Sequence, residues 1–323
     1  MKGFGKYFRY HFRTTLLRAL IIGVLSLLFT AAFSRAEYFP LNGGSRGYVR
    51  YTFGFLPYLF SVLCVLMPAL ELSNLKNRRN LDTLLTLPVS RTAMALSHML
   101  NGLLQTLAIY SACFAYIWLL GFQIREYVSL SPLLPYYFLS ILFGIALYAF
   151  FQFFFMQANN TLDGVLIGLV ASVTGWIVLG RLLNELSVSP LVGWSLFPTI
   201  RIHERCSQIL RYGNVYSSVP NENTVLGIWL CIGLLAIIGY FITFAKKNTE
   251  KIGGISDTFF GYRVLLPICG ISLCWGKLWG LEILGLIATV IGYAIYRRGF
   301  RFKLSDYIVM GIIAACAIFF TFL

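Results

Sequence analysis

Long apolar runs recur along the whole chain, and short charged segments separate them. A run of about 20 apolar residues is long enough to cross the hydrocarbon core of a bilayer as a helix. Hydrophobic residues make up 58% of the 323 positions and charged residues 12%, whereas soluble domains carry about 25% charged residues. The sequence therefore predicts an all-α integral membrane protein. The expected spans cover residues 16–33, 52–72, 93–121, 132–156, 162–180, 224–245, 260–275, 278–296 and 304–323.

Basic residues set the expected direction of these spans. The net charge is +14, but lysine and arginine fall in short clusters between apolar runs, which is typical of a topology signal rather than of nucleic-acid binding. We expect a cytoplasmic N-terminus, and the basic clusters at 246–251 and 297–303 then both lie inside if two spans separate them. Residues 260–275 and 278–296 meet this condition, although the first is short enough to be re-entrant instead. The run at 16–33 lacks a signal-peptidase cleavage site and is expected to stay in the bilayer.

The N-terminal residues 1–15 predict a basic amphipathic helix. At about 100° per residue, aromatic and small polar side chains cover one side, and the cations cover the other. Such a helix lies in the membrane interface with its cations toward anionic head groups; a frayed polar tail is the alternative. The first face holds Phe4, Tyr7, Phe8, His11, Phe12 and Thr15, and the second holds Lys2, Lys6, Arg9 and Arg13.

The charged segment 71–91 reads ELSNLKNRRNLDTLLTLPVSR. Its basic residues, Lys76, Arg78, Arg79 and Arg91, favour a cytoplasmic position. Leucines at the spacing of one helical face favour a short helix that lies against a soluble partner, with an ordinary basic turn as the alternative. These leucines are Leu81, Leu84 and Leu85.

The third expected span, 93–121, is the longest of the nine. Pro88 supplies a stop and Ser90 an N-cap, and a helix of this extent is about 42 Å long, more than the bilayer core. Three polar residues, His98, Asn101 and Gln105, project from one of its faces. They line a possible pathway or form hydrogen bonds between helices, and the sequence leaves both open.

Two further segments have expected roles in the membrane. The long outer segment 181–223 contains an apolar patch at 191–197 between two prolines, which favours a hairpin dipping into the outer leaflet. Small residues at helical spacing on the fifth span predict close helix packing. They are Gly164, Gly168, Ser172 and Gly175.

No pattern in the chain is typical of an enzyme. Six of the seven cysteines lie inside apolar runs, so no disulfide framework is expected. The three histidines, His11, His98 and His203, lie on different segments with no carboxylate or cysteine at metal-ligand spacing. The nearest match to a phosphate-binding loop, at 270–278, lacks the required spacing and ends in leucine. We therefore expect no catalytic residue, bound metal or cofactor on this chain.

The segment around 71–91 resembles the type-2 ABC transporter permeases. Members commonly read Glu, a basic residue, a Gly-Thr-Leu-Glu-like turn, Leu-Leu and Pro-Val-Ser-Arg. The chain departs from the family where Arg79-Asn80 replaces Gly-Thr, where Ser97-His98 replaces Gly-Lys, and in three extra C-terminal spans. The matching positions are Glu71, Arg78, Asn80-Leu81-Asp82, Leu84-Leu85 and Leu87 to Arg91.

The resemblance implies a division of the chain into three parts. Residues 1–15 would be a connecting helix, 16–250 a six-span permease domain with a coupling helix at 71–91, and 251–323 additional spans. The coupling helix would fit a groove on an ATPase. Its implied contact residues are Glu71, Arg78, Arg79, Asp82, Leu84, Leu85, Pro88 and Arg91.

The implied function is that of a permease subunit of an ATP-driven exporter in a cell membrane, as in the bacterial cytoplasmic membrane. Two copies of a separate cytosolic ATPase would bind ATP and Mg, and a second permease, identical or paralogous, would complete the pathway. The cargo would be amphipathic or hydrophobic, such as a peptide, a drug-like molecule or a lipid-linked compound. A non-transporting sensor or immunity subunit that recruits an ATPase is the alternative, and a lipid-modifying membrane enzyme lacks an acid/base pair.

Overall fold

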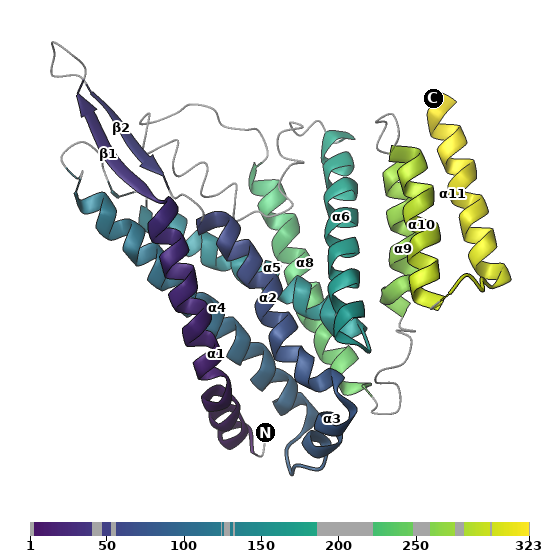
Figure 1. Cartoon of the computed structure of the whole chain (residues 1–323), viewed down its shortest axis with the longest axis horizontal. Helices are drawn as coiled ribbons and strands as arrows, with labels where there is room; N and C mark the ends of the chain where they lie inside the picture. The colour runs from purple at the N-terminus through teal and green to yellow at the C-terminus, as the bar shows by residue number, and fades with distance from the viewer. Residues whose placement is uncertain are drawn as a thin grey trace.

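The computed structural model describes residues 3–40, 47–52, 56–123, 125, 130–131, 133–185, 222–247, 259–274, 281–297 and 299–322. These residues form a row of roughly parallel helices with one β-hairpin at the end opposite the N-terminus (Figure 1). The first helices are α1 (Phe4–Phe33), α2 (Leu56–Ser73), α3 (Arg78–Leu85), α4 (Arg91–Phe122) and α5 (Leu133–Gln157). The later ones are α6 (Thr161–Glu185), α8 (Glu222–Ala245), α9 (Val264–Cys274), α10 (Leu281–Arg297) and α11 (Leu304–Phe322).

A helix occupies the position of every predicted span. Among the described residues, five helices are long and apolar enough to cross a membrane, and the chain is therefore a multi-pass helical membrane protein. The remaining spans correspond to shorter apolar helices, so the predicted number of nine crossings stays a prediction. The five long segments are Phe4–Phe33, Leu56–Lys76, Arg91–Phe122, Leu133–Gln157 and Gly227–Ala245.

One departure from the predicted all-α class is a two-stranded antiparallel hairpin. Strand β1 (Arg35–Pro40) pairs with β2 (Gly47–Thr52), with Arg35 opposite Thr52 and Pro40 opposite Gly47. Both strands are rich in aromatic residues, which favour extended structure. Their shortness and their position between two long apolar runs hid this signal. The predicted outer segment 181–223 falls mostly outside the described residues, because α6 ends at Glu185 and α8 begins at Glu222.

The separate connecting helix predicted at 1–15 is wrong in one respect, because α1 is a single helix of 30 residues. No glycine or proline interrupts residues 6–22, so nothing ends the first amphipathic turns before the apolar run begins. The two faces are as predicted, since Lys6, Arg9 and Arg13 are exposed while Tyr7 and His11 are buried.

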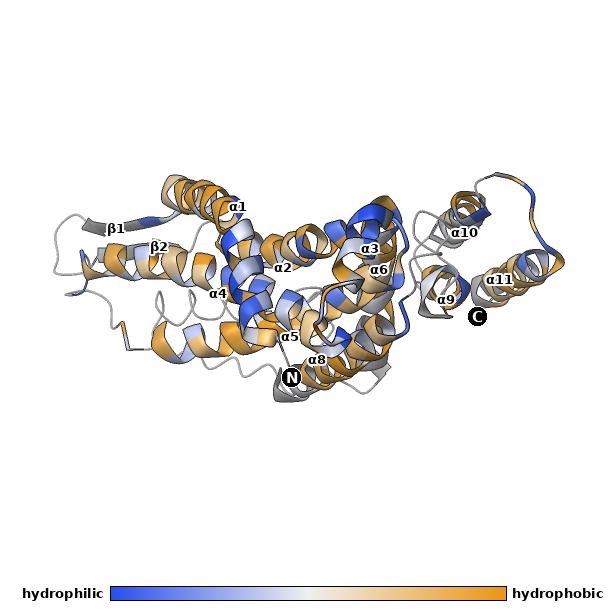
Figure 2. Cartoon of the chain, turned by 90° about the horizontal axis from the view of Figure 1, so that it is seen from below, coloured by the Kyte–Doolittle hydropathy of each residue, from blue (hydrophilic) through white to orange (hydrophobic). Residues whose placement is uncertain are grey.

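Along its length, α1 is apolar outside and polar inside. Its buried positions include Thr15, Ser26 and Thr30, whereas Leu17, Val24 and other large aliphatic residues are exposed. In water this arrangement would be unfavourable, but lipid solvates the aliphatic side chains. Seen from the end that holds α3, hydrophilic colour gathers around α3 and the N-terminal turns, while hydrophobic colour dominates the helix bodies (Figure 2).

The connection between α2 and α4 is compact. After α2, one turn of 3-10 helix, η1 (Asn74–Lys76), leads to α3, whose first turn is capped by the Asn77 side chain accepting from the Arg79 N–H at 3.1 Å. The predicted cap of the third span is confirmed, because the Ser90 hydroxyl accepts from the Ala93 N–H at 3.3 Å. Helix α4 then runs for 32 residues, about 48 Å.

The main core lies between α2, α4 and α5, where Phe60 stacks on Tyr110 with ring centroids 3.9 Å apart. Helix α8 packs along α5, and α6 joins the α9–α11 group through α9 (Figure 1), which follows the π-helical turn η4 (Phe259–Arg263). Gly164 of the predicted small-residue track permits close packing, because a Cβ there would lie 2.8 Å from Phe155. At Gly175, by contrast, a Cβ would meet nothing within 4 Å.

Candidate functional site

Helix α3 lies at the same end of the molecule as the N-terminus (Figure 1). Its anchor is Leu81, which is 3% exposed and packs in a cluster with Leu75 and Met94. Leu84 is half-buried against the same cluster. The described leucines therefore face the protein's own core, and the face left for a partner is polar rather than leucine-rich. Its exposed residues are Arg79, Asn80, Asp82 and Thr83; the side chains of Arg78 and Leu85 lie outside the described part.

Lys76, the last residue of η1, ties this connection to α5. Lys76 is buried, and its ammonium donates to the carbonyls of Phe155, of Ala158 at 3.3 Å and of Asn160 at 3.5 Å. The last carbonyls of a helix have no intrahelical donor, and a cation satisfies both them and the negative end of the helix dipole. Lys76, predicted only as a topology signal, also caps the end of α5.

Arg91, the first residue of α4, ties the connection to α8. Arg91 Nη1 donates to the carbonyl of Ala245 at 2.9 Å and to that of Lys247 at 3.3 Å. The Lys247 ammonium in turn donates to the Ala158 carbonyl at 2.7 Å and to Asn159 Oδ1 at 2.8 Å. Burial lowers the pKa of Lys247 to about 8, so the ammonium still carries its proton at pH 7. The ends of α5 and α8 are thus held together beside α3.

The start of α1 also contacts this region. Gly3 has φ +82°, and a Cβ there would lie 3.1 Å from Val89 and 3.4 Å from the Pro88 carbonyl. A residue other than glycine would strain the backbone and crowd the α3–α4 connection. Pro88 itself is exposed. The N-terminal helix therefore begins directly beside the connection that carries α3.

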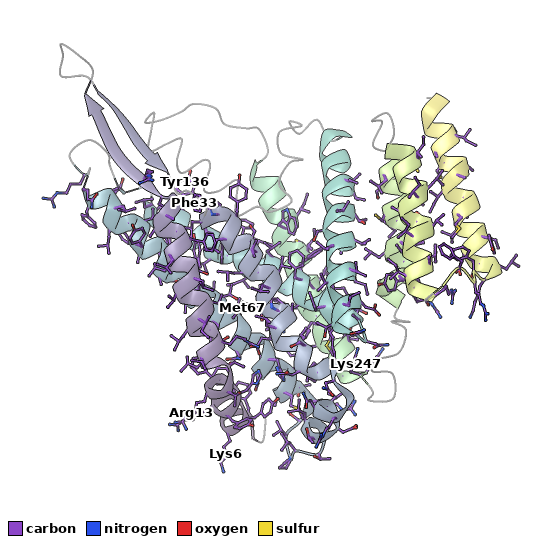
Figure 3. All side chains as sticks on the ribbon, in the orientation of Figure 1. Lys6, Arg13, Phe33, Met67, Tyr136 and Lys247 are labelled. Atoms are coloured by element: carbon purple, nitrogen blue, oxygen red, sulfur yellow. The ribbon has the colours of Figure 1, made fainter. Side chains whose placement is uncertain are left out.

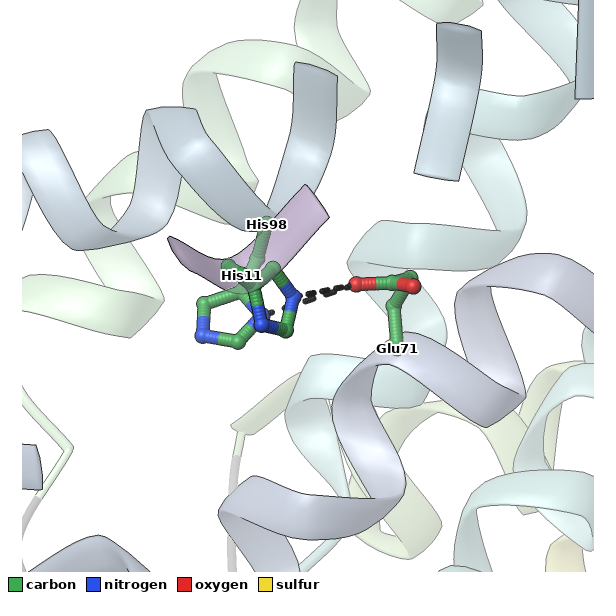
Figure 4. Close-up of side chains that lie close together, drawn as sticks. All are labelled: His11, Glu71 and His98. Carbon is green, nitrogen blue, oxygen red and sulfur yellow. Dashed lines mark hydrogen bonds and ion pairs between the residues drawn. The ribbon is translucent and has the colours of Figure 1, made fainter. Parts of the chain in front are cut away.

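Glu71, predicted as part of the coupling surface, lies inside the protein. It is 1% exposed and lies in the last turn of α2. His11 Nε2 lies 2.6 Å from Glu71 Oε2, and Arg18 pairs with Oε1. Figure 4 shows the His11 and His98 rings converging on the Glu71 carboxylate. A carboxylate at this depth needs partners, and α1 supplies them.

The polar face of α4 is directed at α1. Tyr7 OH lies 3.0 Å from His98 Nε2, and the Asn101 and Gln105 amides donate to Thr15 Oγ1 at 2.9 and 2.8 Å. All three residues of the possible pathway are buried. They form hydrogen bonds between helices, which is the second of the two interpretations that the sequence left open.

The expectation that no metal-ligand set exists is wrong as a statement of geometry. One donor atom from each of His11, Glu71 and His98 lies within 4.8 Å of the others, and all three residues are buried. His11 and Glu71 are 60 positions apart in the chain, so no local spacing could reveal the cluster. The amphipathic pattern did place His11 on the face opposite the cations, which was the available signal.

An apolar cleft lies between α5, α6, α8 and α9. Its volume is about 330 Å³, and its lining is almost entirely aliphatic and aromatic. The aromatic part of the lining comes from Phe150, Phe151, Phe154 and Trp229. Four helices line the cleft. Two of them, α5 and α8, are the helices that Lys76 and Arg91 link to the α3 connection.

No family model, curated protein or solved structure matches this chain.

Proposed function

We propose that this chain is the membrane subunit of an ATP-driven exporter and that α3 is the helix on which a separate cytosolic ATPase docks. The observation that carries the proposal is the setting of α3. It is anchored by Leu81, presents a polar face, and is flanked by Lys76 and Arg91, which bond to the ends of α5 and α8. A surface helix with these links is suited to pass movement into the bundle.

The distribution of charge supports a cytoplasmic position for this end. Exposed basic residues gather there on three helices, and Lys6 and Arg13 are labelled at the lower edge of Figure 3. Short Lys/Arg-rich segments remain on the cytoplasmic side during insertion. The exposed members on α1, α3 and α4 are Lys6, Arg9, Arg13, Arg79 and Arg91.

The contacts suggest how docking would act on the bundle. A displacement of α3 pulls on the Lys76 contacts and on the Arg91 contacts, so α5 and α8 move with it. Both helices line the apolar cleft, and a mostly apolar pocket suits a hydrophobic or amphipathic cargo. ATP and Mg would bind to two copies of the partner ATPase, and a second permease, identical or paralogous, would complete the pathway.

The proposal is tested by reconstituting the purified chain in liposomes with a Walker-type ATPase that copurifies with it from solubilised membranes. Arg79→Glu reverses a charge on the exposed face of α3, and we expect at least a tenfold loss of stimulated ATP hydrolysis. Arg125→Glu is the matched control, because Arg125 is exposed beyond the opposite end of α4. Stimulation by Arg79→Glu at the level of Arg125→Glu, with equal insertion of both, would refute docking at α3.

A further inference from the structure

The cluster of His11, Glu71 and His98 joins three helices within the bundle. The donors are His11 Nε2 on α1, a Glu71 oxygen on α2 and His98 Nδ1 on α4. Glu71 Oε2 lies 2.6 Å from His11 Nε2 and 3.7 Å from His98 Nδ1, and the two imidazole centroids are 4.2 Å apart. The three donors therefore surround one small volume rather than forming a chain.

His98 is incompletely satisfied in this arrangement. Its Nε2 lies 3.0 Å from the Tyr7 hydroxyl, whereas its buried Nδ1 has no hydrogen-bond partner among the described residues. When Nε2 carries the proton, its N–H donates a hydrogen bond to the Tyr7 hydroxyl. The unprotonated Nδ1 then directs a lone pair toward the Glu71 carboxylate. Two acceptors then face each other in a buried site, which is unfavourable unless a proton or a metal ion lies between them.

We propose that His11, Glu71 and His98 bind a divalent first-row transition metal, with Zn²⁺ as the expected ion. Two imidazoles and one carboxylate are a donor set that zinc accepts, with ligand distances of about 2.0–2.2 Å. Ligand atoms 3.7 Å apart can both reach one ion at that distance, while the pair at 2.6 Å has to open toward about 3.4 Å, the spacing of tetrahedral ligands.

Two neighbours would orient the ligands. Tyr7 fixes the ring of His98 through Nε2, and Arg18 pairs with the Glu71 oxygen that the histidines do not contact. Partners of this kind hold the rotamers and tautomers of metal ligands. Arg18 also donates to the Leu70 carbonyl at 3.2 Å and is 28% exposed, so solvent shares its charge. The metal would fasten α1 to α2 and α4, a role that does not depend on the proposed transport function.

The test is a titration of the full-length chain, purified through a tag that contains no histidine and stripped with a chelator. Co²⁺ is the probe, because its visible absorption reports nitrogen and oxygen ligands. We expect one equivalent of Co²⁺ per chain, its displacement by Zn²⁺, and a rise in melting temperature on loading. His98→Asn and His11→Asn should each weaken Co²⁺ binding at least tenfold. His203→Asn is the matched control, because His203 is the third histidine of the chain.

Failure of the wild-type chain to bind Co²⁺ or Zn²⁺ would overturn the site, as would an equal loss of affinity in His203→Asn and His98→Asn. If the histidine variants fail to fold, Tyr7→Phe keeps all three ligands and should bind Co²⁺ about tenfold to a hundredfold more weakly. Unchanged affinity in Tyr7→Phe would argue against the proposed orientation of His98. ATPase stimulation is measured separately, so loss of the metal site leaves the docking proposal intact.

Discussion

Two helix–helix interfaces depend on different kinds of contact. The polar seam lies between α1 and α4, and the glycine seam lies between α5 and α8. On the first, Thr15 accepts from Asn101 and Gln105, and Glu71 on the neighbouring α2 pairs with His11 and Arg18. On the second, helices approach so closely that a Cβ on Gly233 would lie 2.7 Å from Ala146. One seam depends on hydrogen bonds and the other on the absence of a side chain.

The contrast follows from the solvent. Lipid tails are as apolar as leucine, so helices gain little by burying aliphatic side chains against each other, and association depends on close packing or on interhelical hydrogen bonds. The polar seam fixes the register of α1 through directional contacts. The glycine seam brings α5 and α8 into contact along their backbones, and the cations beside α3 then hold the ends of both.

The largest expected effect is on the polar side, at Glu71. Glu71→Leu removes the carboxylate and leaves Arg18 and His11 without their partner, and loss of one member of a buried ion pair costs about 3–5 kcal/mol of the free energy of unfolding. The change is measured by denaturant titration in mixed micelles. Asp82→Leu is the control, because Asp82 is exposed on α3 and should change stability by about 0.5 kcal/mol or less.

On the glycine seam, Gly233→Ala should destabilise the protein by about 1–3 kcal/mol, because the added methyl group overlaps Ala146. Gly227 lies on the same helix, and a Cβ there meets nothing within 4 Å. Gly227→Ala should therefore be neutral or stabilise α8 by up to about 1 kcal/mol. The same denaturant titration compares the two variants, and equal effects would show that α8 does not approach α5 closely at Gly233.

The smallest effect is expected at Thr15. Thr15→Val removes the oxygen that accepts from Asn101 and Gln105, and interhelical hydrogen bonds of this kind are worth about 0.6–1.7 kcal/mol. A double-mutant cycle with Asn101→Leu isolates the pairwise coupling energy. Thr14→Val is the control, because in the described contacts the Thr14 hydroxyl bonds only within its own helix. A coupling energy of zero would mean that the polar seam does not position α1.

Much of the fold could be predicted because helix position depends on local pattern. Apolar run length located each of the five described helices that are long and apolar enough to cross a membrane, and the 100° periodicity separated Lys6 and Arg13 from Tyr7 and His11. The Ser90 cap was also a local signal. The continuity of α1 was missed because the change from amphipathic to apolar pattern was treated as a boundary, although no residue there ends a helix.

The candidate sites were harder to predict because their contacts are not local. Leu81 sits on the expected face, but periodicity does not say whether that face meets the protein's own core or a partner. Glu71 and Lys76 occupy positions where charge signals topology, and yet tertiary contacts bury both. The roles of the coupling residues stay predictions, since the structure fixes their positions and not their partner.

Docking at α3 is tested most directly by site-specific photo-crosslinking of this helix to the proposed partner ATPase in native membranes. A photoreactive phenylalanine analogue replaces Thr83 on the exposed face of α3, or Gln123 at the far end of α4 as the matched position. Docking at α3 predicts a crosslinked band that contains a Walker-type ATPase from position 83 and none from position 123. A band from position 123 with none from position 83 would contradict it.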